Sequence, residues 1–130
     1  GLVRIHEFIE QCEGRQAAPA GELRVSLTPA AITHAALQSG DPLCARALDM
    51  FISCYGAVAG DHALAVMARG GVYVAGGIAP KILPRLLAGG FLAAFNARGA
   101  PSDAVRKIPV SIVTNERLAV LGAALLALRP

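Results

Sequence analysis

The chain has 130 residues, of which 55% are apolar and 16% are charged, and its mean hydropathy is +0.54. This length suits one compact domain that buries about two thirds of its unfolded surface, and the composition is too apolar for a disordered segment. The formal net charge of +3 comes from basic residues scattered along the chain, of which only Arg106 and Lys107 are adjacent. Nucleic-acid binding needs clustered basic residues, so we expect no nucleic-acid partner.

The sequence also bears on membranes and on redox environment. No apolar run reaches the 18 residues that a membrane-spanning helix needs, so we expect no membrane span. The chain begins with Gly1, and Glu7 and Glu10 follow early, unlike a cleavable signal sequence; we expect a segment of a longer protein. Three cysteines without a C-x-x-C pair lie among apolar residues of predicted helices, which is typical of buried thiols in a reducing compartment.

Two helices are predicted before residue 41. Apolar residues recur at helical spacing over residues 2–12, which predicts an amphipathic helix. Residues 15–27 show no such spacing and contain glycine and proline, so they predict a surface connection. Thr28 followed by Pro29 is typical of the start of a helix, and Gly40 is typical of a left-handed helix end.

A long central helix is predicted next. Asp41 and Pro42 favour a helix start, and the apolar pattern should continue to about residues 67–68. Gly56 and Gly60 lie four residues apart on one face of this helix, although glycine inside a helix costs about 1 kcal/mol relative to alanine. We therefore expect a neighbouring element to pack closely against this face.

The C-terminal half predicts alternating strands and helices. The first element is a strand at 72–75, between the pairs Gly70-Gly71 and Gly76-Gly77, and a helix from Pro80 follows it with an interruption at Gly89-Gly90. A loop at 100–103 then leads to a second strand at 108–113. A last helix follows, capped by Thr114 or Asn115. The whole order is α, α, long α, β, α, β, α, which is an α/β pattern. Two strands alone leave unpaired edges, so we expect an incomplete sheet whose other strands lie in missing chain or in a partner molecule.

Sequence patterns of familiar catalytic and metal sites are missing. The chain contains no G-x-S-x-G, H-E-x-x-H or G-x-G-x-x-G pattern. His6, His34 and His62 are far apart and have no partner at metal-ligand spacing. We therefore assign no catalytic residue and no metal ligand. Asp61 lies in the long apolar helix, where we expect a structural partner for its carboxylate rather than a catalytic role.

One segment remains as a candidate site, the predicted strand, Gly76-Gly77 turn and helix of residues 72–81. Backbone N–H groups between the carboxyl end of a parallel strand and a helix N-terminus favour an anionic ligand. Glycines at such a turn let a ligand reach the backbone. The same turn is also consistent with glycines that only supply positive φ angles, without any ligand.

Residues 70–81, Gly-Gly-Val-Tyr-Val-Ala-Gly-Gly-Ile-Ala-Pro-Lys, resemble the C-terminal part of the bacterial glucokinase family. These are ATP-dependent hexose kinases of the actin-like, ribonuclease H-like fold. Further segments resemble the same family in the same order: residues 1–5, 51–65, 90–95, 108–110 and 121–124. The resemblance implies that residues 1–130 are the second half of the large actin-like ATPase domain and that the N-terminal domain is absent.

The resemblance also implies a function. Members transfer the γ-phosphoryl group of ATP, with Mg²⁺, to the 6-hydroxyl of glucose, and we expect a cytoplasmic homodimer. The family's catalytic aspartate, sugar-binding motifs and phosphate-binding hairpin do not occur in these residues, so we expect a segment that contributes the nucleotide side of the cleft and is inactive alone. Gly76 and Gly77 carry over as backbone beside the nucleotide. The alternative is a non-catalytic, sugar-kinase-like regulatory or dimerisation module.

Overall fold

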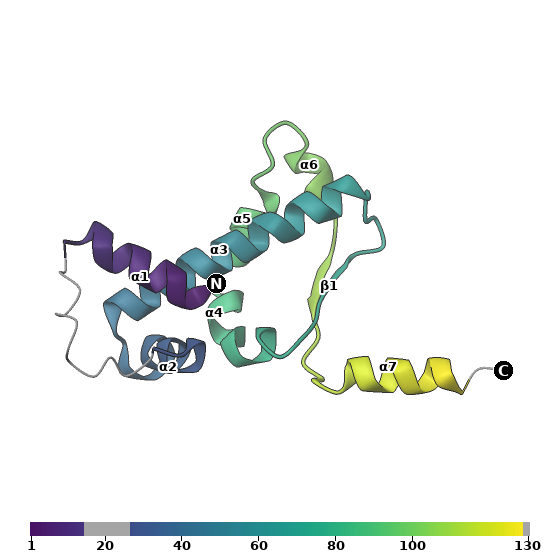
Figure 1. Ribbon diagram of the computed structural model, residues 1–130. Helices are drawn as coiled ribbons and strands as arrows, with labels where there is room; N and C mark the ends of the chain where they lie inside the picture. Colours follow the sequence, from purple (N-terminus) through teal and green to yellow (C-terminus); the bar gives the residue numbers. More distant parts are fainter. Residues whose placement is uncertain (15–26, 129–130) are drawn as a thin grey trace.

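The computed structural model describes residues 1–14 and 27–128, and most of the predicted connection at 15–27 lies outside them (Figure 1). Within these ranges the order of elements agrees with the predicted α/β pattern. They are α1 (Leu2–Cys12), α2 (Pro29–His34), the π-helical turn η1 (Ala35–Ser39), α3 (Pro42–Ala65), β1 (Val72–Val74), the 3₁₀ turn η2 (Ala79–Ile82), α4 (Leu83–Leu87), α5 (Gly90–Asn96), α6 (Ser102–Val105), β2 (Val110–Ile112) and α7 (Leu118–Ala127).

The predicted helix starts at Thr28 and Asp41 are confirmed. Thr28 Oγ1 accepts a hydrogen bond from the N–H of Ala31 at 3.1 Å, and Asp41 Oδ1 accepts one from the N–H of Cys44 at 2.7 Å. Each bond satisfies a donor that the first helical turn leaves unpaired. Gly40 has a φ of 65°, which confirms the left-handed end before α3. The turn η1 before this glycine was not predicted.

α3 ends at Ala65, before the predicted end at 67–68. The N–H of Met67 donates to the carbonyl of Leu64 at 3.1 Å, and the N–H of Ala68 donates to the carbonyl of Ala63 at 2.9 Å. These two bonds form a Schellman motif. Met67 has a φ of 47° and occupies the left-handed position that usually holds glycine.

α3 packs closely against α5, as the glycine spacing predicted (Figure 1). A Cβ atom on Gly56 would collide with the carbonyl oxygen of Phe91, and one on Gly60 would collide with that of Phe95. Both phenylalanines are buried, and the Phe91 ring meets the Tyr55 ring edge to face at 5.5 Å between centroids. Backbone contact between the helices thus places two aromatic rings in the core.

α3 is long and apolar enough, by its length and composition, to span a membrane. It has 24 residues, although no uninterrupted apolar run in the sequence reaches the length of a membrane span. In the structure α3 contacts α1, α2, α5 and α6, and eight of its residues are buried. These contacts make α3 the central packing helix of the fold.

β1 and β2 form a parallel two-stranded sheet. The register pairs Val72 with Val110 and Val74 with Ile112, and the N–H of Val72 donates to the carbonyl of Pro109 at 2.8 Å. Each strand has three residues and is shorter than predicted. Among the described residues no third strand pairs with either edge, which agrees with the prediction of an incomplete sheet.

The C-terminal part departs from the sequence predictions in two places. The loop predicted at 100–103 includes the start of α6, a short helix. Asn115 does not cap α7 directly: its Oδ1 accepts a hydrogen bond from the N–H of Arg117 at 3.0 Å, and Arg117 is the residue before the helix. Figure 1 shows α7 extending away from the other elements, and none of its residues is buried.

The expectation of three buried thiols is wrong for two of them. Cys44 is buried, whereas Cys12 and Cys54 are exposed on the solvent sides of α1 and α3. The reason is that apolar neighbours in sequence do not lie on one face of a helix. Burial raises the pKa of the Cys44 thiol to about 11, and the hydrogen bond and charge of Asp41 act in the same direction.

Candidate functional site

The two glycines at the carboxyl end of β1 have different roles. Gly76 has a φ of 114°, which L-residues rarely adopt, so the turn itself requires glycine there. Gly77 has no positive φ, and a Cβ atom on it would contact nothing within 4 Å. Neither backbone strain nor packing therefore requires glycine at position 77. Its missing side chain leaves an exposed stretch of backbone.

The segment after Gly77 corrects one prediction. A regular helix was expected from Pro80, with its N-terminal dipole facing the turn. The structure instead has the turn η2, followed by only five residues of α4. Ile78 precedes η2 and makes no side-chain capping bond. The helix-dipole argument therefore does not apply here, and any ligand would be recognised by the backbone and side chains.

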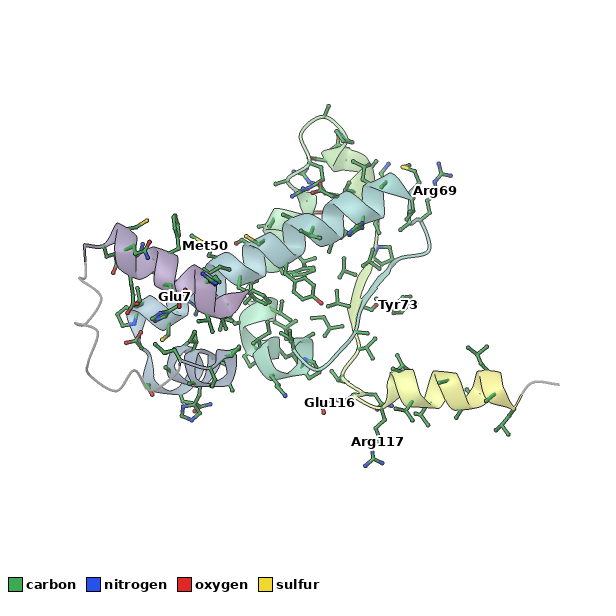
Figure 2. The ribbon with its side chains drawn as sticks, viewed as in Figure 1. Glu7, Met50, Arg69, Tyr73, Glu116 and Arg117 are labelled. Atoms are coloured by element: carbon green, nitrogen blue, oxygen red, sulfur yellow. The ribbon has the colours of Figure 1, made fainter. Side chains whose placement is uncertain are left out.

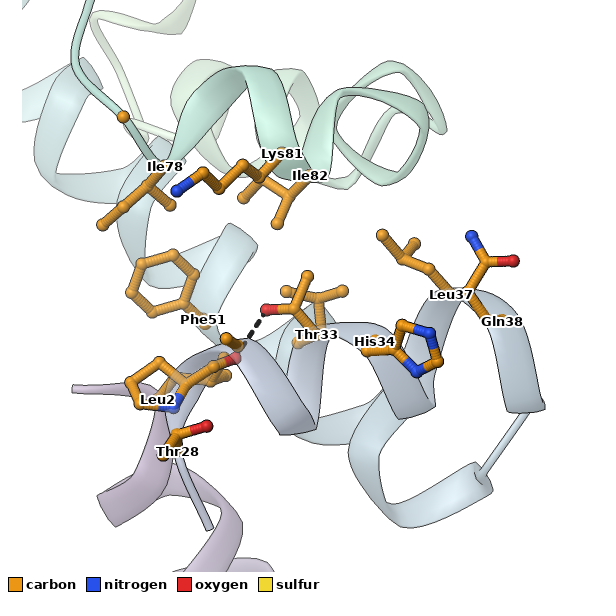
Figure 3. A pocket seen from close by; sticks show the side chains of 14 residues that line it. Leu2, Thr28, Thr33, His34, Leu37, Gln38, Phe51, Ile78, Lys81 and Ile82 are labelled. Carbon is orange, nitrogen blue, oxygen red and sulfur yellow. Dashed lines mark hydrogen bonds between the residues drawn. The ribbon is translucent and has the colours of Figure 1, made fainter.

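A cavity of about 730 Å³ adjoins Gly77 (Figure 3). It lies between η2 and α2, and side chains of α1 and α3 complete its wall. Residues far apart in sequence therefore face one space, as Gly77 and His34 illustrate. The cavity is of the size that small-molecule sites have in proteins.

Most of the cavity wall is apolar. Figure 3 shows Phe51 of α3 beneath Ile78, with Ile82 further along the same side and Leu37 across from it. Leu2 of α1 closes one end. Such a wall can hold a flat, apolar ring system away from water.

A few polar groups interrupt this wall. Lys81 extends into the cavity from η2, and its side chain forms no ion pair within residues 1–14 and 27–128 (Figure 3). His34 and Gln38 line the opposite side. Thr33 Oγ1 donates to the carbonyl of Pro29 at 2.8 Å, so this hydroxyl already has an acceptor. None of the described residues that line the cavity is acidic, so they make a neutral to positive environment suited to an anionic ligand.

The acidic side chains of α3 face away from this cavity and pair with arginines. Asp49 accepts two hydrogen bonds from Arg85, both at 2.7 Å, and this contact raises the pKa of the guanidinium. Asp61 accepts one from Arg98 at 2.5 Å, which confirms the structural partner expected for it. In the described part of the chain no three histidine, cysteine or acidic residues come together as a metal site would require.

The sequence thus identified one side of the cavity and missed the other. Gly77 and Lys81 belong to the predicted strand–turn–helix segment. Thr33, His34 and Gln38 join them only because the segment of α2 and η1 lies across the cavity from η2, and no sequence spacing signals that arrangement. The cavity as a whole can hold a ring system with a negatively charged group, next to an exposed backbone turn.

Comparison with known proteins identifies the family. A family model described as Glucokinase matches residues 1–130. The chain belongs to the glucokinase family. A glucokinase from Mesorhizobium japonicum is 42% identical over 130 residues, which are 100% of this chain and 36% of that protein. A glucokinase from Nostoc punctiforme is 39% identical, over 99% of this chain and 42% of that protein.

A solved glucokinase structure agrees with this assignment. The crystal structure of a glucokinase from an Antarctic psychrotroph matches 95% of this chain with a TM-score of 0.81 and 31% identity, and the match covers 36% of that protein. The resemblance drawn from the sequence and its α/β fold are therefore confirmed. The chain spans 36–42% of the length of these relatives and corresponds to a C-terminal segment of glucokinases.

Proposed function

We propose that residues 1–130 form the nucleotide side of the cleft of a glucokinase that transfers the γ-phosphoryl group of ATP to the 6-hydroxyl of glucose. The observation that carries this proposal is the cavity beside Gly77. Its apolar wall suits an aromatic base, and the open backbone of Gly76 and Gly77 lies where a ribose or phosphate could approach it. Lys81 supplies a positive charge at the same opening.

The rest of the reaction belongs to residues outside this cavity. Phosphoryl transfer depends on positioning the two substrates and on neutralising charge around the phosphates. The cavity wall has no carboxylate among the residues that the structure describes, so these residues do not fit Mg²⁺ as ligands. In this proposal the chain binds and orients the nucleoside, the remainder of the large domain and an N-terminal domain provide the glucose site and the base, and the chain alone is inactive.

A chimera tests this proposal. Residues 1–130 replace the matching segment of the Mesorhizobium japonicum glucokinase, which is 42% identical over that length. We expect the chimera to phosphorylate glucose with ATP in a coupled assay and the isolated chain to show no activity. A chimera that folds, by circular dichroism and cooperative melting, and binds glucose but not ATP would contradict the proposal.

The same experiment addresses the alternative of a non-catalytic regulatory or dimerisation module. The feature that favours this alternative is α7, whose apolar side chains are exposed, Val120 by 71% and Leu125 by 67%. Exposed apolar surface of this kind favours association with another surface. A module of this type would give a folded chimera without ATP binding. We also propose that the whole enzyme is cytoplasmic and forms a homodimer. Sedimentation of the active chimera would test the homodimer.

A further inference from the structure

A second cavity lies at the opposite end of β1 from Gly76, where the strand begins. Its volume is about 450 Å³. Its walls come from the end of α3 with the residues just after it, and from α6 with its connection to β2, two segments that are far apart in sequence. The lining residues are Leu64, Met67, Arg69, Ala104, Lys107 and Ile108.

Two basic residues, Arg69 and Lys107, line this cavity. The side chains of Arg69 and Lys107 are exposed, and neither forms a hydrogen bond or ion pair in the parts of the chain that the structure describes. The neighbouring Arg106 differs, since its guanidinium lies 3.6 Å from Asp103. Within residues 1–14 and 27–128, no acidic residue lines the cavity. Like charges around one space repel each other, and a bound anion would offset that repulsion.

Apolar side chains form the remainder of the lining, and one of them is held in an unusual conformation. Leu64 and Ile108 supply ordinary wall contacts. Met67 lines the cavity from the left-handed position of the Schellman motif, where glycine is the usual residue. Strained positions of this kind often lie at functional sites. The chain thus retains a side chain in the cavity at a position where a glycine would be less strained.

We propose that this cavity binds a small organic anion, with its phosphate or carboxylate group between Arg69 and Lys107 and its apolar body against Met67. Guanidinium and ammonium groups are the usual partners of both anions, and an apolar body explains the remaining wall. This ligand is distinct from the nucleotide proposed beside Gly77, because the two cavities lie at opposite ends of β1 and share no lining residue.

The two methionines of the chain make the test specific. Met50 and Met67 are the only methionines, so methyl labelling gives one signal at the cavity and one internal control. Both lie on or just after α3, about 25 Å apart at the rise of an α-helix. Figure 2 shows Met50 on α3 and Arg69 beyond the far end of this helix, well separated from each other. The variant Met50→Leu assigns the two signals.

The probes are phenyl phosphate and benzoate, with benzyl alcohol as a neutral analogue, titrated into the purified chain. We expect phenyl phosphate or benzoate to shift the Met67 methyl signal in a saturable way and to leave Met50 unchanged, and benzyl alcohol to shift neither. The double variant Arg69→Gln/Lys107→Gln should weaken binding at least 10-fold. The matched variant Arg117→Gln removes an exposed arginine next to α7 and should bind as the unmodified chain does (Figure 2).

Three results would overturn the proposal. In the first, neither anion shifts Met67. In the second, benzyl alcohol shifts it as strongly as the anions, which would identify a purely apolar cavity. In the third, the Arg117→Gln variant weakens binding as much as the double variant, which would indicate general attraction to the net charge of the chain. Because the readout is binding at Met67, none of these results depends on the activity of a glucokinase chimera.

Discussion

Gly56 of α3 lies directly against the carbonyl group of Phe91 of α5, at a separation that leaves no room for a Cβ atom. We expect Gly56→Ala to push the two helices apart and to lower the free energy of unfolding by about 2–3 kcal/mol, as overpacking does in a core. Urea denaturation followed by circular dichroism measures this change. The contact is with backbone, so no side-chain rotation can relieve it.

The matched control for this substitution is Gly122→Ala in α7. A Cβ atom at Gly122 meets nothing within 4 Å. Alanine has the higher helix propensity, so this substitution should stabilise α7 by up to about 1 kcal/mol. If both substitutions change stability by the same amount, helix propensity rather than the α3–α5 contact determines the effect at Gly56.

Met67→Gly should stabilise the protein. The left-handed conformation costs an L-residue about 1–2 kcal/mol, and glycine avoids this cost while losing about 0.5–1 kcal/mol through its more flexible unfolded state. We therefore expect a net gain of about 0.5–1 kcal/mol in urea denaturation. The same change at Met50, inside α3, should instead destabilise by about 1 kcal/mol. If Met67→Gly instead lowers the free energy of unfolding, the contacts of the Met67 side chain contribute more stability than its backbone strain costs.

Arg98 and Arg85 offer a comparison of two arginine–aspartate pairs. The Arg98 side chain is only 13% exposed and donates to Asp61 and to the carbonyl of Ala94, both at 2.5 Å. The Arg85 side chain is 39% exposed, and its pair with Asp49 lies at the surface. We expect Arg98→Ala to cost about 2 kcal/mol and Arg85→Ala less than about 1 kcal/mol. Thermal denaturation measures both losses of stability. Equal losses for the two variants would contradict a larger contribution from the buried Arg98 pair.

Cys44 gives the protein a pH dependence at high pH. The pKa of its thiol rises from 9.0 to about 11 in the folded protein, chiefly because of burial. Well below pH 9 the thiol keeps its proton in both the folded and the unfolded state, so its contribution to the free energy of unfolding is complete. Between pH 9 and 11 the unfolded chain ionises first, so stability falls by on the order of 2–3 kcal/mol.

The measurement is the free energy of unfolding at pH 8, 9, 10 and 11 for the unmodified chain and for Cys44→Ala. The variant should be less stable at pH 8 because it leaves a small void, but it should lose less stability between pH 9 and 11. If the free energy of unfolding falls equally with pH in both proteins, groups other than Cys44 cause the pH dependence of stability.

Gly77 tests the proposed nucleotide side of the cleft. In the glucokinase chimera we expect Gly77→Val to raise the KM for ATP about 10-fold or more, because the new side chain enters the opening next to Lys81. The KM for glucose should change little. Gly70→Val is the matched control, since Gly70 also lies in open space without a positive φ, at the other end of β1. An equal effect of both variants on the KM for ATP would count against a nucleotide at Gly77.

The sequence predicted those features that depend on a few neighbouring residues. The starts of α2 and α3 were predicted because Thr28 and Asp41 bond to backbone N–H groups three residues ahead. The close approach of α3 and α5 was predicted because glycines inside a helix are unfavourable without a reason. The sequence could not predict the end of α3, because Met67 occupies a position where sequence rules expect glycine.

Features that depend on distant residues were missed for a different reason. The cavity beside Gly77 lies between α2 and η2, and its walls bring together segments more than forty residues apart, such as those of His34 and Gly77. The exposure of Cys12 and Cys54 depends on which side of each helix the core covers. Local patterns carry no information about either choice. The family resemblance singled out the Gly76-Gly77 turn, and a nucleotide beside this turn stays a prediction.

The register of the sheet has a consequence for how the chain folds. Val72 pairs with Val110, 38 positions later, and Gly56 meets Phe91 across 35 positions, so the two loops cost nearly the same conformational entropy to close. Three-residue strands repay that cost poorly, whereas the contact of α3 with α5 buries the rings of Phe91 and Phe95. We expect helix pairing to form the transition state and the strands to join afterwards, so that Gly56→Ala slows refolding while Val110→Ala mainly speeds unfolding.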